Sequence, residues 1–126
     1  MLGDADLVAL VAATDLERAR AFYEGALGLK VVGGDDYGCV FDANGTSLRV
    51  SLVQELTPAP YTVLGWTVAD IRATARELAS LGVAFQRYDG MGQDQDEVWT
   101  APGGAKVAWF RDPDGNTLSL TEPASR

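Results

Sequence analysis

The apolar positions in the first half of the chain change their spacing in a regular order. Residues 7–13 form an apolar run that is short enough to be a buried strand. From Leu16 to Leu27 the apolar residues recur every three or four positions, which predicts a helix with one apolar face. Short strands are expected near 29–33, 37–42 and 47–53, because turns rich in Gly, Asp and Asn separate them. The pattern predicts the order strand, helix, strand, strand, strand.

Local signals mark both ends of the predicted first helix. Thr14 is expected to cap it, and Glu17 is expected to reach back to that cap in a capping box. Gly28 is expected to end the helix, because glycine tolerates the left-handed conformation found after many helices. These signals place the helix between Thr14 and Gly28.

The second half of the chain repeats this order. A strand is expected at 61–68, followed by a helix that Asp70 caps, whose apolar stripe runs from Ile71 to Leu81 and which Gly82 ends. Further strands are expected at 83–88, 105–111 and 117–121. The stretch 89–104 is rich in Gly, Asp and Gln, so we expect a long loop there, with a short strand around Val98 and Trp99.

The repetition predicts one α+β domain, residues 1–126, built from two βαβββ modules at about 5–56 and 61–122. The linker 57–60 separates the modules. In each module the helix covers one face of the mixed sheet, so the sheet is free to curl around its other face. Two such modules paired side by side enclose a cleft between their curled sheets. The alternative is a plain α+β sandwich without a usable cleft. We favour the cleft, because neither module could bury its own sheet alone.

Composition narrows the class of function. Eighteen acidic and ten basic residues give a net charge of −8, which disfavours nucleic acid and anionic membranes as partners. Histidine is absent, which removes every mechanism that uses a histidine base or ligand. Cys39 is the sole cysteine and has no partner for an internal disulfide. With no secretory or membrane-spanning segment in the sequence, we expect a cytoplasmic protein.

Two motifs resemble the signatures of a known family. Residues 15–23, followed by Leu27-Gly28-Leu29, are similar to the first-helix signature of the vicinal oxygen chelate superfamily, which includes glyoxalase, bleomycin resistance and dioxygenase proteins. Residues 110–116 are similar to its last-hairpin signature. The resemblance implies the paired-module fold but no single activity. Residues 112–116 also have the composition of a turn, so we do not expect Asp112 or Asp114 to be catalytic.

The resemblance allows a test for a metal site. Metal-dependent members hold their ion with two side chains from the first strands and two from the last strands of the modules. In this sequence those positions fall on Val8, Val63, Arg49 and Ser119. A divalent cation needs imidazole, carboxylate or thiolate ligands, and neither these residues nor their neighbours supply such a set. We predict a protein without a metal and without a cofactor.

Strand alternation selects the residues that line the expected cleft. Trp66 falls on the helix side and is interpreted as core. For Tyr37, which shares a strand face with Cys39, and for Trp109, alternation does not decide whether the side chain faces the cleft. Tyr88 directly precedes the long loop, and Trp99 lies in it. The candidate ligand-binding residues are Val8, Tyr37, Arg49, Ser51, Thr67, Tyr88, Trp99, Trp109 and Ser119.

Two functions fit this lining. The first is a metal-free protein that sequesters a mostly apolar organic ligand, such as a drug or metabolite, as in the bleomycin-resistance branch. The alternative is a metal-independent isomerase or lyase, in which Arg49 stabilises an oxyanion and Tyr37, Tyr88, Cys39 or a carboxylate transfers a proton. We favour binding, because no motif supplies an acid–base pair. We also expect a homodimer, because curled sheets leave edges that a partner covers.

Overall fold

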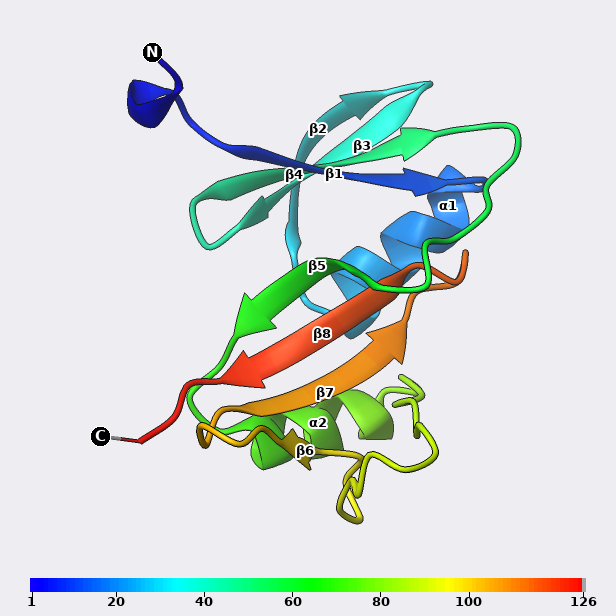
Figure 1. The fold of residues 1–126 in the computed structure, drawn as a ribbon. Helices are drawn as coiled ribbons and strands as arrows, with labels where there is room; N and C mark the ends of the chain where they lie inside the picture. The colour runs from blue at the N-terminus through cyan, green and yellow to red at the C-terminus, as the bar shows by residue number, and fades with distance from the viewer. Residues whose placement is uncertain (126) are drawn as a thin grey trace. The chain divides into compact units, whose positions relative to one another are not determined.

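The protein, whose structure is a computed structural model, is described over residues 1–125. These residues fall into two compact units, Met1–Thr57 and the part from Pro58 onward. Each unit contains one four-stranded sheet and one α-helix (Figure 1). Within the described residues, no helix combines the length and the apolar character needed to cross a membrane. That both units form one domain stays a prediction.

The first unit follows the predicted order of elements. Its elements are η1 Leu2–Asp4, β1 Val8–Ala13, α1 Leu16–Arg20, η2 Ala21–Ala26, β2 Lys30–Asp35, β3 Gly38–Ala43 and β4 Thr46–Leu52. The strand order in the sheet is β1-β4-β3-β2. Strands β1 and β4 run parallel, whereas the other neighbours are antiparallel. A bulge between Val31 and Gly33 interrupts the pairing of β2 with β3.

The first helix starts and continues differently from the prediction. Asp15, not Thr14, is the N-cap: its carboxylate accepts a hydrogen bond from the Arg18 backbone N–H at 3.1 Å. The prediction that Thr14 caps this helix was therefore wrong. The Thr14 hydroxyl accepts a hydrogen bond from the Arg18 guanidinium at 3.2 Å. After Arg20 the chain continues as the π-helical turn η2. Gly28, with a φ of 74°, lies just past this turn, as the sequence predicts.

The second unit repeats the topology of the first. Its elements are β5 Thr62–Thr67, α2 Ile71–Ser80, β6 Trp99–Thr100, β7 Lys106–Arg111 and β8 Thr117–Glu122. The strand order β5-β8-β7-β6 matches β1-β4-β3-β2. As with β1 and β4, the neighbouring strands β5 and β8 run parallel. Asp70 caps α2 by accepting from the Ala73 N–H at 3.1 Å, as predicted. The two predicted βαβββ repeats are thus present.

The strand predicted at 83–88 is replaced by an isolated bridge between Phe85 and Phe110. The Gln86 N–H donates to the Trp109 carbonyl at 2.8 Å, but the pairing stops there. The reason is the Gln93 side chain, whose amide donates to the Gln86 carbonyl at 2.8 Å and accepts from the Tyr88 N–H at 2.6 Å. These are the backbone groups that a longer ladder would have used.

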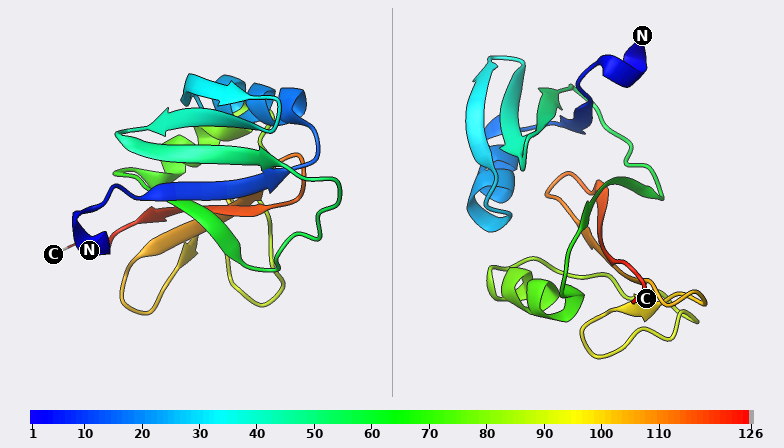
Figure 2. Two further views of the ribbon diagram at one scale, coloured as in Figure 1. Left: turned by 90° about the horizontal axis from the view of Figure 1, so that it is seen from above. Right: turned by 90° about the vertical axis from the view of Figure 1, so that its left-hand side faces the viewer.

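Each helix covers one face of its own sheet (Figure 2). Helix α1 packs on β3 and β4, and α2 packs on β7 and β8. The covered faces hold the core, which includes Tyr23, Phe41, Leu48, Val50, Ile71, Phe110 and Leu118, all below 2% exposed. Trp66 stacks on Phe110 with ring centroids 6.3 Å apart, which agrees with its interpretation as core. The side chains that alternate with these residues lie on the opposite face, called here the open face of each sheet.

Candidate functional site

The open face of the first sheet carries three of the candidate residues. Arg49 lies opposite Leu10 in the parallel ladder, and Ser51 lies opposite Ala12. Val8 lies opposite Ser47, one step along the same face, so Val8 and Arg49 share a face but are not neighbours in the ladder. The two first-unit positions of the metal test are therefore not side by side.

Arg49 is already engaged within its own unit. Its guanidinium Nη2 lies 3.4 Å from Asp35 Oδ1. The guanidinium also lies over Gly38, since a Cβ atom there would come within 2.6–3.0 Å of its atoms. The pKa of Asp35 is lowered, first by the hydrogen bond from the Tyr37 N–H at 2.8 Å and then by the Arg49 charge. Asp35 is therefore an ionised partner for Arg49 at neutral pH.

Tyr37 and Cys39 do not share the open face with Arg49. Tyr37 lies in the turn before β3 and is 73% exposed. Cys39 pairs with Val50, so it points with Val50 and Phe41 toward the helix. Burial raises the pKa of the Cys39 thiol, with smaller influences from Arg20 and Glu24. The thiol is protonated at neutral pH and is a poor nucleophile.

The main cavity of the first unit lies on this helix side. It has a volume of about 480 Å³ and is bounded by α1, β2 and β3, with Leu16, Arg20, Val31 and Cys39 among its lining residues. None of the nine candidate ligand-binding residues lines it. Its lining does include Asp35 and Gly38, the two residues that lie beside the Arg49 guanidinium.

The open face of the second sheet brings four candidate residues together. Trp109 contacts Tyr88 edge to face, with ring centroids 5.6 Å apart and an angle of 84°. Trp99 also contacts Trp109, with ring centroids 6.0 Å apart and an angle of 34° between the ring planes. Ser119 pairs with Trp109 in the ladder and is 7% exposed. Thr67 lies farther along the same face, opposite Thr121. We call Tyr88, Trp99 and Trp109 the aromatic cluster.

A bulge removes Val63 from its predicted position. Thr62 pairs with Thr117 and Leu64 pairs with Leu118, so Val63 is an extra residue without a ladder partner. Gly65 takes the place opposite Ser119, where a Cβ would lie 2.9 Å from the Ser119 Oγ. No residue pattern in this segment signals the bulge, because each of its residues also suits a regular strand.

The residues around the metal-test positions do not fit a divalent cation. The neighbours of Ser119 are Gly65 and Trp109, and the neighbours of Arg49 are Leu10 and Val40. None of these side chains is a ligand that zinc, iron or manganese prefers. Across residues 1–125, no three His, Cys, Asp or Glu side chains gather closely enough to hold a metal.

A hydrogen-bonded loop, residues 86–98, supports the aromatic cluster. Gln93 is 7% exposed, and its amide also donates to the Glu97 carbonyl at 2.8 Å. Arg87 donates to the carbonyls of Gln93 and Asp94 at 3.3 and 2.8 Å and pairs with Glu97. Tyr88 lies near the start of this loop, and Trp99 directly follows its end. Its internal bonds therefore fix the separation of the two outer rings of the cluster.

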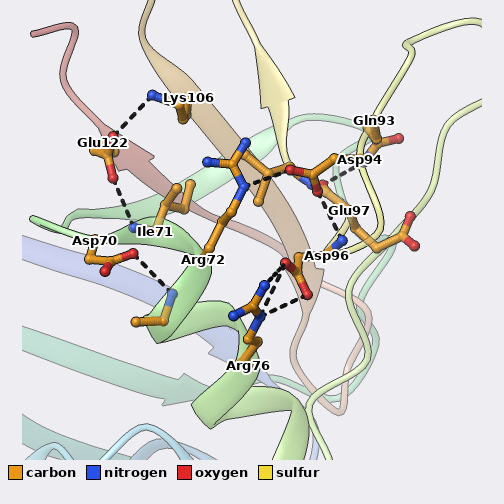
Figure 3. A network of polar contacts seen from close by, with 12 residues as sticks. Asp70, Ile71, Arg72, Arg76, Gln93, Asp94, Asp96, Glu97, Lys106 and Glu122 are labelled. Carbon is orange, nitrogen blue, oxygen red and sulfur yellow. Dashed lines mark hydrogen bonds and ion pairs between the residues drawn. The ribbon is translucent and has the colours of Figure 1, made fainter.

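Two ion pairs attach this loop to α2 (Figure 3). Arg72 Nε donates to Asp94 Oδ2 at 2.8 Å, and Arg76 pairs with Asp96 at 3.0 Å. Burial alone would raise the pKa of Asp94, but hydrogen bonds from Val98, Arg72 and Asp96 outweigh it and lower the pKa. This attachment is not among the predictions from sequence, although two arginines four residues apart on one helix face and an acidic loop are a visible signal for it.

The last hairpin has the local structure that its composition predicts. The Asp112 carboxylate accepts from the N–H groups of Asp114 and Asn116 at 3.0 and 2.9 Å and from the Asn116 side-chain amide at 2.8 Å. Gly115 has a φ of 87°. Asp112 therefore holds a turn, and its carboxylate oxygens are occupied.

We predict that Asp94→Asn lowers the free energy of unfolding by roughly 1–2 kcal/mol at neutral pH, because the Arg72 pair is weakened. Folding lowers the pKa of Asp94. The ionised carboxylate therefore contributes fully to the free energy of unfolding above the unfolded-state pKa of roughly 3.9, and this contribution is lost as the pH falls through the folded-state pKa. The difference in melting temperature from the wild type should therefore shrink in acid. Asp6→Asn, an exposed carboxylate without an ion pair among residues 1–125, is the control. An unchanged difference at all pH values would contradict this account.

We also predict that Arg49→Met raises the pKa of Asp35 without restoring its usual value. The guanidinium charge is lost, whereas the larger influence, the Tyr37 N–H, remains. A carboxyl-detected NMR titration of Asp35 in both proteins measures this shift. A full return to the usual pKa, or no change, would show that the causes are assigned wrongly.

Comparison with known proteins agrees with this fold. A sequence model described as the Glyoxalase/Bleomycin resistance protein/Dioxygenase superfamily matches residues 6–120. Among curated proteins none matches the chain. A solved superfamily member from Sphaerobacter thermophilus DSM 20745 is 25% identical, with a TM-score of 0.74, and the match covers 94% of this chain and 97% of that one. A glyoxalase family protein from Bacillus anthracis is 21% identical (TM-score 0.73; 94% of each chain covered).

A lactoylglutathione lyase from Agrobacterium tumefaciens is 19% identical, with a TM-score of 0.73, over 94% of this chain and 93% of that one. At this level of identity the likeness concerns the fold alone. The family match, in contrast, spans nearly the whole sequence and includes both motifs of the sequence analysis. The chain belongs to the Glyoxalase/Bleomycin resistance protein/Dioxygenase superfamily.

Proposed function

We propose that this protein binds a small organic molecule with a flat, mostly apolar body, and that it does so without a metal and without converting the molecule. The binding surface is the open face of the second sheet, and the aromatic cluster is its apolar part. The observation that carries the proposal is the meeting of Tyr88, Trp99 and Trp109 on the face that the helix does not cover. Rings with a few hydroxyl groups beside them are typical of ligand sites.

The position of these rings distinguishes them from core aromatics. Trp66 and Phe110 stack on the covered face of the same sheet, where Phe110 is fully buried. Trp99 and Trp109 are only half-buried, and Tyr88 is 36% exposed. Adjacent aromatic rings that remain partly exposed offer apolar area for a ligand to cover.

The loop of residues 86–98 favours binding, because it holds the rings of the aromatic cluster in place and so reduces the entropy that they lose when a ligand binds. Gln93 and Asp94 make their hydrogen bonds within the unit before any ligand is present. A binding surface that is already rigid loses less freedom on association than a flexible one. The network of Figure 3 is therefore a support for the aromatic cluster.

The titratable groups favour binding over the alternative of an isomerase or lyase. Asp35 is the carboxylate beside Arg49, but its lowered pKa makes it a weak base. The Cys39 thiol points away from Arg49 and is protonated. Glu122 accepts from the Ile71 N–H and the Lys106 ammonium, which lower its pKa. None of these three groups therefore forms an acid–base pair with Arg49.

The proposal includes a homodimer in the cytoplasm, with neither nucleic acid nor membrane as a partner. Strands β1 and β5 stand at the edges of their sheets. An edge strand has backbone groups that a second copy of the chain can cover. The net charge of −8 is consistent with a protein that repels phosphate-rich partners.

We predict that compounds found in a thermal-shift screen of metabolites and drugs raise the melting temperature of the wild type and of Trp66→Phe, but not of Trp109→Leu. A ligand that binds only the folded state raises the melting temperature, and Trp109→Leu removes the central ring of the cluster. Trp66→Phe is the matched control, because it alters an aromatic residue on the covered face. Prior treatment with a chelator should leave the shifts unchanged.

The proposal fails in two recognisable ways. If Trp109→Leu binds the same compounds as tightly as the wild type, the ligand does not lie on the aromatic cluster. If binding disappears after chelation and returns with an added metal, the function depends on a metal that the site residues do not explain.

A further inference from the structure

Arg111 is a cation on the same open face as the aromatic cluster. It follows Trp109 by two residues on β7, and strand side chains two residues apart point to one face. The ladder agrees, because Trp109 pairs with Ser119 and Arg111 pairs with Thr117. With a rise of about 3.4 Å per residue, Arg111 starts about 7 Å from Trp109 along the strand.

Among the arginines that the structure describes, Arg111 differs from the others because its guanidinium has no partner. It is exposed, and among residues 1–125 it makes no ion pair or hydrogen bond. In contrast, the side chains at positions 20, 49, 72, 76 and 87 each face a carboxylate. In a chain with eighteen acidic residues, an arginine without a carboxylate beside it leaves a place for an anion from outside.

The groups between the cation and the rings are small and polar. Thr117 and Ser119 are 6% and 7% exposed and lie in the rows of Arg111 and Trp109. Asp112, the next residue along the chain, uses its carboxylate to accept hydrogen bonds from the N–H groups of Asp114 and Asn116. Glu122 lies at the opposite end of the β7–β8 ladder, where it pairs with Lys106. The face therefore presents, in order, aromatic rings, hydroxyl groups and a free cation.

We infer that the ligand of this face is an aromatic acid of one or two rings. This inference rests on the proposed function and adds the chemical class of the ligand. The ring of the acid lies against Trp109 and Trp99, and its carboxylate accepts two parallel hydrogen bonds from Arg111, as guanidinium and carboxylate geometry allows. The net charge of the chain would attract cations over a distance, but the nearest charge decides at contact.

The test compares three compounds with one carbon skeleton: cinnamate, cinnamyl alcohol and cinnamylamine. Isothermal titration measures their affinity for the wild type, Arg111→Gln, Arg111→Lys and Lys30→Gln. Lys30→Gln removes one positive charge from the first unit and controls for net charge. We expect cinnamate to bind the wild type more tightly than the other two. Arg111→Gln should weaken cinnamate by about tenfold or more and leave cinnamyl alcohol unchanged.

Arg111→Lys should recover part of the lost affinity, because it restores the charge but not the paired hydrogen bonds. Lys30→Gln should bind cinnamate within about twofold of the wild type, because an exposed charge that does not touch the ligand is screened by salt. Three results would overturn the aromatic-acid inference. They are cinnamyl alcohol binding the wild type as tightly as cinnamate, cinnamate binding Arg111→Gln as tightly as the wild type, and no binding of cinnamate by the wild type. The proposed function is judged separately, because it stands if compounds of any class depend on Trp109.

Discussion

In each unit of this chain a single helix has to cover a four-stranded sheet, and a helix covers only one of the two faces. The covered faces take the large apolar residues, such as Phe41 and Leu48 in the first unit and Phe110 and Leu118 in the second. Side chains alternate along a strand, so the residues between these core positions lie on the open face. The chemistry of both open faces is therefore fixed by the same alternation that builds the core.

The two open faces differ in what they offer. In the first unit the open face has a cation, Arg49, that Asp35 already pairs with. In the second unit it has the aromatic cluster, buried hydroxyl groups and Arg111, a cation that pairs with no carboxylate of residues 1–125. The loop of residues 86–98 fixes this second face through bonds to its own backbone and ion pairs to α2. Support and binding surface belong to one unit, which is why the second unit carries the functional proposal.

The sequence predicts much of this arrangement, because alternation and helical spacing are visible in it. The repeated order of elements, the helix end at Gly28, the core role of Trp66 and the turn at Asp112 all agree with the structure. The failures come from interactions between residues that the pattern does not connect. The Gln93 side chain takes the bonds of a predicted strand, and Val63 leaves the ladder in a bulge. The meeting of Tyr88 with Trp109 likewise depends on how the long loop folds, which local spacing does not reveal.

We propose above all that a ligand lies on the open face of the second sheet. The three tryptophans test it directly, because Trp99 and Trp109 lie on that face and Trp66 lies on the other. Each indole N–H gives its own signal in a proton–nitrogen NMR spectrum, which is recorded during titration with the compound that raises the melting temperature most. We predict that the Trp99 and Trp109 signals shift in a saturable way while the Trp66 signal stays in place. A saturable shift of Trp66 alone, or of none of the three, would contradict the account.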